Sequence, residues 1–183
     1  MRPCLGAEPM DVTPPLLAVC GTRPEVVKMA PVIAALRARG QRVLLVMTGQ
    51  HPDLAPQMLR ELGLVADIDL GVHLAGAAPA QLLAALLMRL APVFAAWQPR
   101  LALVQGDTVS ALAGALAAAY AQVPVAHVEA GLRTHDRHEP FPEEMHRCLI
   151  APVSALHFAP TDAAAAALLR EGICRSRIHV TGN

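Results

Sequence analysis

The sequence is poor in aromatic residues, in charge and in cysteine, and each scarcity argues against a class of protein. Of its 183 residues, 3% are aromatic and 16% are charged, and 15 basic residues balance 15 acidic ones. Such a balance indicates no attraction to nucleic acid or to an anionic membrane surface. The four cysteines show no C-x-x-C spacing. A reducing, cytoplasmic environment is therefore expected, and a disulfide framework is not.

A secretory signal is also not indicated, because residues 1–15 contain prolines and acidic residues but no apolar core. These residues are predicted to form a flexible tail. Residues 77–97 and 109–128 are long and apolar, but the first stretch contains Arg89 and the second is interrupted by Pro124. Both are interpreted as core helices and not as membrane spans.

What the sequence has in abundance is apolar residues, at 54%, enough to bury the core of one domain over residues 16–183. Short apolar runs alternate with longer helical patterns throughout this range. Strands are predicted at 16–20, 42–48, 67–72, 101–105, 123–128, 155–159 and 177–181, and helices at 25–39, 53–62, 79–97, 109–121, 142–150 and 162–171. This alternation predicts an α/β fold with a Rossmann-like, doubly wound parallel sheet.

In such a sheet, ligands bind beyond the carboxyl ends of the strands. The segment 21–25 (Gly-Thr-Arg-Pro-Glu) follows the first strand and opens a helix, whose free N–H groups and positive dipole end attract phosphate. Arg23 can grip diphosphate oxygens, and Lys28 lies one turn further on. A capped turn with two solvated cations fits the same residues equally well. No GxGxxG or GxxxxGK[ST] pattern is present, which disfavours NAD and P-loop ATP chemistry, so no cofactor is expected.

Acidic residues follow three successive strand ends in the second half of the chain. Asp107 and Glu143 each have a structural interpretation, as a helix cap and as a partner of a helix dipole. Glu129, at the end of an apolar strand, is harder to explain, because burial without a partner is costly. Three carboxylates around one crevice, beside a cationic loop, can supply matched acids and bases, and this joint interpretation is preferred.

Histidines gather near the same loops, where they could in principle bind a metal ion. Their spacing matches no HExxH or other zinc pattern, so no metal is expected. The residues concerned are His127, His135, His138 and His146, with Asp136 and Glu139. His51 follows another strand end and either contacts a ligand or is solvated.

Six segments together resemble the non-hydrolysing UDP-N-acetylglucosamine 2-epimerases. They are residues 21–31, 48–51, 105–108, 127–134, 142–145 and 179–183. The segments occur in the family's order from about residue 16 to the last residue, which makes the resemblance specific, whereas any one alone would be weak. Two departures are Gln105, where the family usually has histidine, and His135, where glycine is common.

The resemblance implies an isomerase that interconverts UDP-GlcNAc and UDP-ManNAc by eliminating UDP across C1–C2 of the sugar and adding it back after protonation of the other face. It implies a GT-B-like enzyme of two Rossmann-like domains, of which this chain matches the first, so the chain alone is expected to be poorly active. By position, Asp107, Glu129 and Glu143 match the family's acidic catalytic residues. Substrate contacts are assigned to Arg23, Lys28, Gln50, His51, Thr108 and Arg133.

The resemblance also implies a homodimer formed through helices of this domain, and a role in cell-envelope polysaccharide biosynthesis. Two alternatives stay open. One is a non-catalytic module of the same fold. The other is a hydrolysing relative, which would release UDP and free ManNAc instead of the epimeric nucleotide sugar.

Overall fold

The structure, a computed structural model, describes residues 13–49, 56–74 and 76–183. Most of the predicted tail and the start of the helix predicted at 53–62 lie outside these residues. The described helices are α1 (Arg23–Ala38), α2 (Pro56–Glu61), α3 (Pro79–Trp97), α4 (Val109–Tyr120), α5 (Glu143–Val153) and α6 (Asp162–Arg170), with a short 3-10 helix at Arg175–Arg177.

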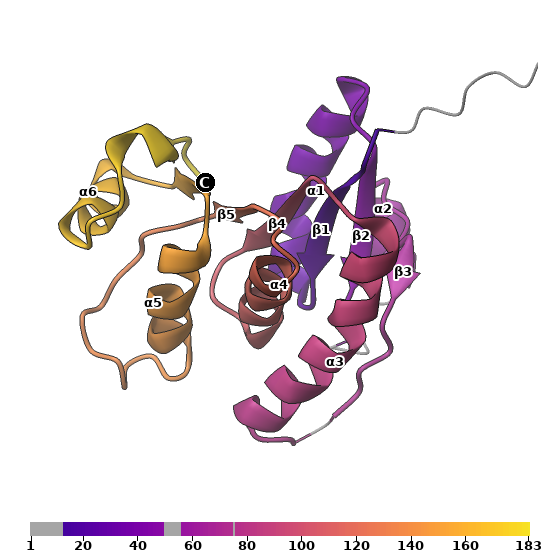
Figure 1. The fold of residues 1–183 in the computed structure, drawn as a ribbon, viewed down its shortest axis with the longest axis horizontal. Helices are drawn as coiled ribbons and strands as arrows, with labels where there is room; N and C mark the ends of the chain where they lie inside the picture. The colour runs from indigo at the N-terminus through magenta and orange to yellow at the C-terminus, as the bar shows by residue number, and fades with distance from the viewer. Residues whose placement is uncertain (1–12, 50–55, 75) are drawn as a thin grey trace, which may run out of the picture.

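One seven-stranded sheet forms the centre of the molecule, and every neighbouring pair of strands in it is parallel (Figure 1). The order is β3-β2-β1-β4-β5-β6-β7. The strands are β1 (Leu16–Cys20), β2 (Val43–Met47), β3 (Ile68–Asp69), β4 (Leu101–Gln105), β5 (Val125–Val128), β6 (Leu156–Ala159) and β7 (Ile178–Val180). The predicted doubly wound parallel sheet is thereby confirmed.

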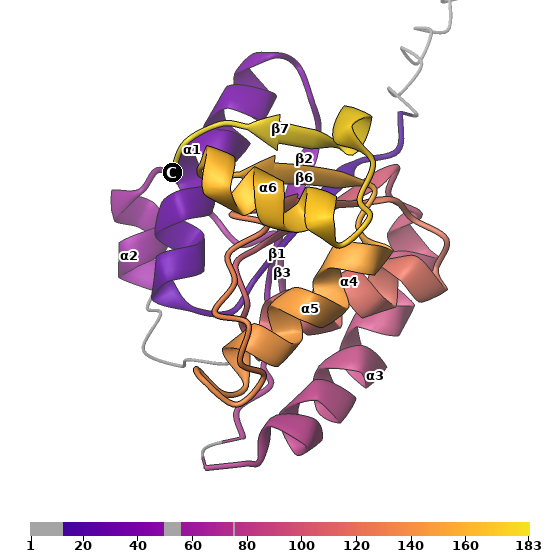
Figure 2. The same ribbon diagram turned by 90° about the vertical axis from the view of Figure 1, so that its left-hand side faces the viewer.

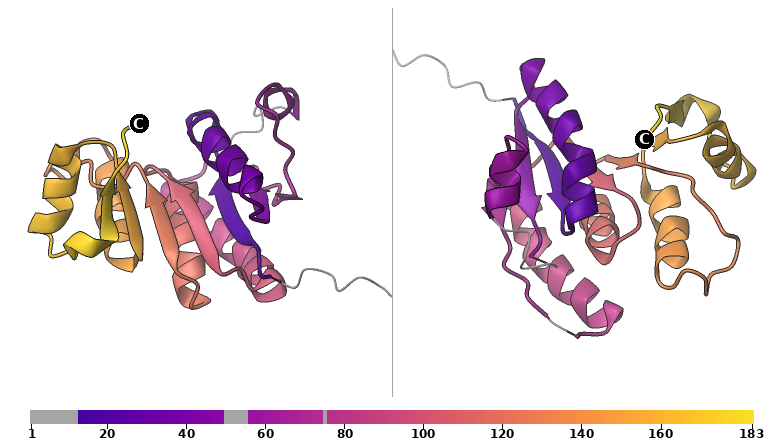
Figure 3. Two further views of the ribbon diagram at one scale, coloured as in Figure 1. Left: turned by 90° about the horizontal axis from the view of Figure 1, so that it is seen from above. Right: turned by 180° about the vertical axis from the view of Figure 1, so that it is seen from behind.

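Helices cover both faces of the sheet, which explains why its central strands read as unbroken apolar runs. All five residues of β1 and all five of β2 are buried. The helices α1 and α2 pack on one face, and the right-hand view of Figure 3 shows α1 in front of the strands. On the other face α3, α4 and α5 lie side by side (Figure 2).

The alanine-rich sequence of α4 lets this helix lie very close to the sheet. A side chain built at Gly114 would have its Cβ 3.0 Å from Val104 and 3.1 Å from Val19, on β4 and β1. The two central strands and α4 therefore form a tightly packed unit beneath the loops that follow those strands.

By length and composition alone, α3 would pass as a membrane-spanning helix. That is weak evidence, because core helices of soluble proteins share these properties. In this fold α3 packs along α4, and its buried residues Leu86, Leu90 and Phe94 recur at helical spacing on the side that joins the core.

The strand order changes direction between β1 and β4. From β1 the chain proceeds outward to β2 and β3, and from β4 it proceeds the opposite way to β7. The loops after these two strands consequently diverge and leave a crevice at the carboxyl edge of the sheet, where doubly wound proteins bind ligands.

Candidate active site

The loop after β1 is held by a carboxylate that sequence reasoning did not single out. Glu25, in the first turn of α1, is 1% exposed and accepts hydrogen bonds from the backbone N–H of Gly21 (2.9 Å) and of Thr22 (2.6 Å). It also accepts one from the hydroxyl of Thr108 (2.7 Å). Burial raises the pKa of the Glu25 carboxyl, and these hydrogen bonds oppose the shift. The Thr-x-x-Glu spacing of a capping box was the available signal.

This arrangement changes how the start of α1 can bind phosphate. Two N–H groups at the turn, those of Gly21 and Thr22, point at Glu25 and are not free for an anion. The exposed Arg23 side chain therefore remains the main cationic group that this turn offers to a diphosphate.

Glu129 lies just beyond β5, in the left-handed backbone region, with φ of 64°. Its Oε1 accepts from Lys28 Nζ at 2.6 Å and from Asn183 Nδ2 at 3.1 Å, while Oε2 accepts from the amide of Gln105. Its side chain is 12% exposed. Three donors from separate parts of the chain therefore hold the Glu129 carboxylate in place.

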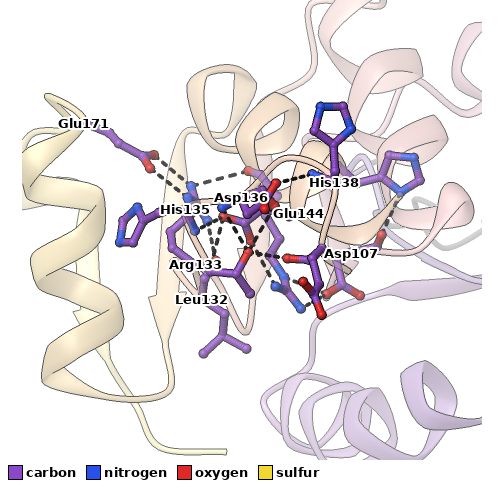
Figure 4. A network of polar contacts seen from close by, with 12 residues as sticks. Asp107, Leu132, Arg133, His135, Asp136, His138, Glu144 and Glu171 are labelled. Carbon is purple, nitrogen blue, oxygen red and sulfur yellow. Dashed lines mark hydrogen bonds and ion pairs between the residues drawn. The ribbon is translucent and has the colours of Figure 1, made fainter. Parts of the chain in front are cut away.

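Asp107, which is labelled in Figure 4, lies in the loop after β4 and is held by two residues of α5. The Nε atom of Arg147 donates to Oδ2 at 2.8 Å, and Nη2 lies 2.6 Å from the same oxygen in an ion pair. The Nδ1 atom of His146 donates to the backbone carbonyl of Asp107 at 2.7 Å. Helix α5 therefore fixes both the backbone and the side chain of this residue.

The adjacent acids Glu143 and Glu144 have different surroundings. Glu144 is 1% exposed and its Oε1 accepts from the N–H groups of Thr134 and His135, both at 3.0 Å. Its Oε2 accepts from Arg147 at 3.0 Å. Burial alone would raise the pKa of Glu144, but the two amides and the guanidinium outweigh it and lower the pKa. Glu143 instead faces a pocket.

That pocket, of about 470 Å³, occupies the crevice at the carboxyl edge of the sheet. Asp107 and Glu143 both line it, so two of the three predicted acidic residues meet there, together with Thr108. Glu129 does not line it. The remaining walls come from residues at or near the starts of α1, α3, α4 and α5, and they comprise Thr22, Pro24, Ala77, Pro79, Leu82, Val109, Pro142 and His146.

Of the residues assigned to substrate binding, Thr108 lines the pocket, whereas Arg23, Lys28 and Arg133 are not among its lining residues. The side chain of Arg133 is 2% exposed and binds both carboxylate oxygens of Glu171 at 2.7 and 2.8 Å. It also donates to the carbonyl of Leu132 at 2.7 Å, so its donors are committed within the chain. Gln50 and His51 lie outside the described residues.

Two of the histidines near these loops, His127 and His146, donate hydrogen bonds from their rings to backbone carbonyls. His127, on β5, is fully buried and its Nε2 donates to the carbonyl of Gly106 at 2.7 Å. Burial lowers the pKa of His127 to about 4, so the ring is neutral at pH 7. Within residues 13–49, 56–74 and 76–183, no three side chains of His, Cys, Asp or Glu are grouped as a metal would require.

Comparison with known proteins gives a consistent result. The family model described as UDP-N-acetylglucosamine 2-epimerase matches residues 34–183. A UDP-N-acetylglucosamine 2-epimerase of Escherichia coli K12 is 41% identical over 169 residues, and a putative one of Thermotoga maritima is 42% identical. Each match covers 92% of this chain. The chain spans about 45% of the length of these curated relatives.

Solved structures agree with this comparison. A UDP-GlcNAc 2-epimerase of Neisseria meningitidis, bound to UDP-GlcNAc, superposes with a TM-score of 0.87 at 38% identity, over 92% of this chain and 46% of that one. A Methanocaldococcus jannaschii UDP-GlcNAc 2-epimerase, in complex with UDP-GlcNAc and UDP, gives a TM-score of 0.80 at 35% identity, over 92% and 45% respectively.

Proposed function

Because this chain belongs to the UDP-N-acetylglucosamine 2-epimerase family, we propose that it carries the acidic part of a site that interconverts UDP-GlcNAc and UDP-ManNAc. The observation that carries the proposal is the meeting of Asp107 and Glu143 in one pocket at the carboxyl edge of the sheet. Glu129, at the next strand end, is the third carboxylate of the proposed set.

The reaction that suits these groups is elimination followed by addition. A carboxylate removes the proton from C2, the C–H electron pair forms a C1–C2 double bond, and the C1–O bond breaks as UDP leaves. A second acid then returns a proton to the opposite face of C2, and UDP adds back at C1. Inversion therefore requires proton-handling groups on both faces of the ring, and several separately placed carboxyl groups can meet that need.

The cations suggest how the leaving group is held. Arg23 is exposed beside the pocket residues Thr22 and Pro24, and a guanidinium binds diphosphate oxygens bidentately. Lys28 is bound to Glu129, so we assign it to the orientation of that carboxylate and to the local positive charge. Thr108, whose hydroxyl donates to Glu25, shapes the pocket wall.

NMR of the full-length natural protein, incubated with UDP-GlcNAc in D2O, tests this function. We expect UDP-ManNAc to form with deuterium at C2, and Asp107→Asn or Glu143→Gln to lower the rate by about 100-fold or more. Asp69→Asn, an exposed change at the end of β3, is the matched control and should keep the wild-type rate. Glu143→Gln with unchanged turnover would contradict the proposal. Free ManNAc would indicate a hydrolysing enzyme, and a folded protein that binds no UDP-GlcNAc would indicate a non-catalytic module.

We also propose that the protein is a homodimer that associates through α3 and α4. An apolar groove of about 730 Å³ runs between these helices, and its lining includes Met88, Phe94 and Tyr120. Met88 is 77% exposed and Tyr120 is 83% exposed in the single chain. Large apolar side chains gathered at one groove are typical of a surface that another protein covers.

The cellular setting completes the proposal. Cys20, Cys148 and Cys174 are free thiols, which suits a reducing cytoplasm. A nucleotide sugar is an activated donor of its sugar, so we propose that the product is used in cell-envelope polysaccharide biosynthesis. Cell fractionation should recover the protein with cytoplasmic markers, and recovery from the periplasm or the membrane would contradict this location.

A further inference from the structure

We infer that Arg147 is a positioning residue, which aims the carboxylate of Asp107 into the pocket and couples it to the loop of residues 132–141. The inference rests on the proposed function for the identity of the reaction. The coupling between the two loops stands on the contacts of the chain alone.

The contacts between Arg147 and Asp107 all fall on one oxygen. Nε donates to Oδ2 at 2.8 Å, and Nη2 lies 2.6 Å from the same oxygen in an ion pair. The Asp107 side chain is 23% exposed and lines the 470 Å³ pocket. Fixing Oδ2 in this way orients the carboxylate while leaving Oδ1 available to a molecule in the pocket.

The remaining guanidinium nitrogen of Arg147 extends the connection to a second loop. Nη1 donates to Oε2 of Glu144 at 3.0 Å, and Oε1 of Glu144 accepts from the N–H groups of Thr134 and His135. His135 has a φ of 66°, in the left-handed region, so this carboxylate holds a bend of the loop. A continuous series of contacts therefore joins the candidate catalytic carboxylate to the 132–141 loop.

Arginine is required here for a geometric reason. A planar guanidinium presents donors in two directions at once, toward Asp107 and toward Glu144, whereas a lysine ammonium is a compact point charge on a flexible stem. Arg147 is also one helical turn from Glu144, so α5 presents the pair together. His146 separately holds the backbone of Asp107, so losing Arg147 should disturb the side chain more than the fold.

The first test compares Arg147→Lys with Arg37→Lys, a control that alters another arginine–aspartate pair, Arg37 with Asp67, away from the pocket. We expect Arg147→Lys to keep the circular dichroism spectrum and KM within about threefold while kcat falls by about 100-fold, since a small misplacement of a reacting group costs that much. Arg37→Lys should keep both constants. An unchanged kcat in Arg147→Lys would overturn the inference.

A double-mutant cycle separates positioning from a general structural effect. If Arg147 acts through Asp107, adding Arg147→Lys to Asp107→Asn should lower the residual rate, followed in long incubations, by less than about threefold. The full 100-fold loss in that background would show that Arg147 acts elsewhere and would overturn the inference.

Hydrogen exchange tests the coupling without any turnover. The N–H groups of Thr134 and His135 should exchange at least about tenfold faster in Arg147→Lys than in the wild type, because Glu144 loses its partner. Unchanged exchange would overturn the coupling, whereas a wild-type protein with no epimerase activity would overturn only the proposed function. If Arg147→Lys fails to fold, the same exchange and kcat measurements are made on Glu144→Gln, for which we expect the same outcomes.

Discussion

Buried ionisable side chains hold the loops of this site. In the folded protein, hydrogen bonds to the chain replace the water that would otherwise solvate each of them. Glu25 and Glu144 accept backbone N–H groups, whereas His127 donates to a backbone carbonyl from a fully buried position. A buried ionisable group with few compensating hydrogen bonds makes the free energy of unfolding depend most strongly on pH. His127 is one such group, because its Nδ1 is buried without a hydrogen-bond partner in the described part of the chain, and His157 is another.

We predict that the protein loses stability between pH 6.5 and pH 4 because of His127. Burial lowers the pKa of this ring to about 4, below the ordinary value of 6.5, so in this range the unfolded chain binds a proton that the folded one does not. His127 therefore lowers the free energy of unfolding only below about pH 6.5, and the loss grows as the pH falls toward 4. At pH 5 the loss from this one residue should be about 2 kcal/mol.

Urea unfolding at pH 7.5 and pH 5.0 measures this loss. His127→Gln keeps a donor for the carbonyl of Gly106 but does not titrate, so the difference between the two pH values should shrink by about 2 kcal/mol. His138→Gln, a change in an exposed histidine, is the control and should preserve the wild-type difference. An equal difference in wild type and His127→Gln would contradict the prediction.

A glycine in the loop after β5 is required for both space and backbone conformation. Gly131 has a φ of 90°, and a Cβ there would lie 2.3 Å from the carbonyl oxygen of Ala164 on α6. Gly172 has a similar φ of 84°, but a Cβ there would meet nothing within 4 Å. We predict that Gly131→Ala costs about 3 kcal/mol, from strain and overlap, and that Gly172→Ala costs about 1 kcal/mol, from strain alone.

Chemical denaturation of the two alanine variants checks this comparison. The difference between them isolates the close approach of α6 to the loop, because the backbone strain is common to both. Equal losses would show that the loop can move away from Ala164, and that the packing of α6 does not fix its position.

Among the helices, α4 and α6 begin in the same way, yet only one of the two N-caps touches the site. Thr108 accepts from the N–H of Ala111 at 3.0 Å, and Thr161 accepts from the N–H of Ala164 at 3.1 Å. Thr108 additionally donates to the buried Glu25. This second bond ties the loop after β4 to the loop after β1.

Valine has the shape of threonine without the hydroxyl. Replacing each cap by valine should therefore lower the free energy of unfolding by unequal amounts. Thr161→Val removes one cap and should cost about 1 kcal/mol. Thr108→Val also removes a donor from a buried carboxylate and should cost about 3 kcal/mol. Thermal unfolding followed by circular dichroism compares the two, and equal shifts in Tm would show that Glu25 does not depend on Thr108.

The elements of the fold were largely predictable, because apolar periodicity and turn residues encode them locally. β1, α3 and β4 have the predicted bounds. The predicted strand 123–128 is shorter, since β5 begins at Val125, after Pro124, which has no N–H to donate. The predicted helix 142–150 is longer, because α5 continues to Val153 with Pro152 in its last turn. The 3-10 helix was not predicted.

The partners of the site were less predictable, because they meet across long stretches of sequence. Asp107 and Glu143 stand at strand and helix ends, where the fold class alone directs attention. Arg147, by contrast, contacts Asp107 although the two are 40 residues apart in sequence, and no local pattern predicts that contact. Arg133 illustrates the converse, since its motif suggests a ligand contact while its donors are committed to Glu171 and backbone oxygens.

At the scale of the whole molecule, one helix links the pocket to the apolar groove. Pro79, at the start of α3, lines the pocket, and Met88 and Phe94, further along the same helix, line the groove. Figure 1 shows α3 as a long helix beside α4. A partner seated in the groove would therefore fix the helix that forms one wall of the pocket.

We predict that the protein is a dimer at micromolar concentration and that Met88→Lys makes it monomeric. Met88 is 77% exposed at the groove, and burying a lysine ammonium in an apolar contact without a counter-ion is costly. Val65→Lys is the matched control, since Val65 is 70% exposed and lies outside the groove. Light scattering after size exclusion should give twice the chain mass for the wild type and Val65→Lys, and the single mass for Met88→Lys. A monomeric wild type would show that this apolar face is not an interface between copies of the chain.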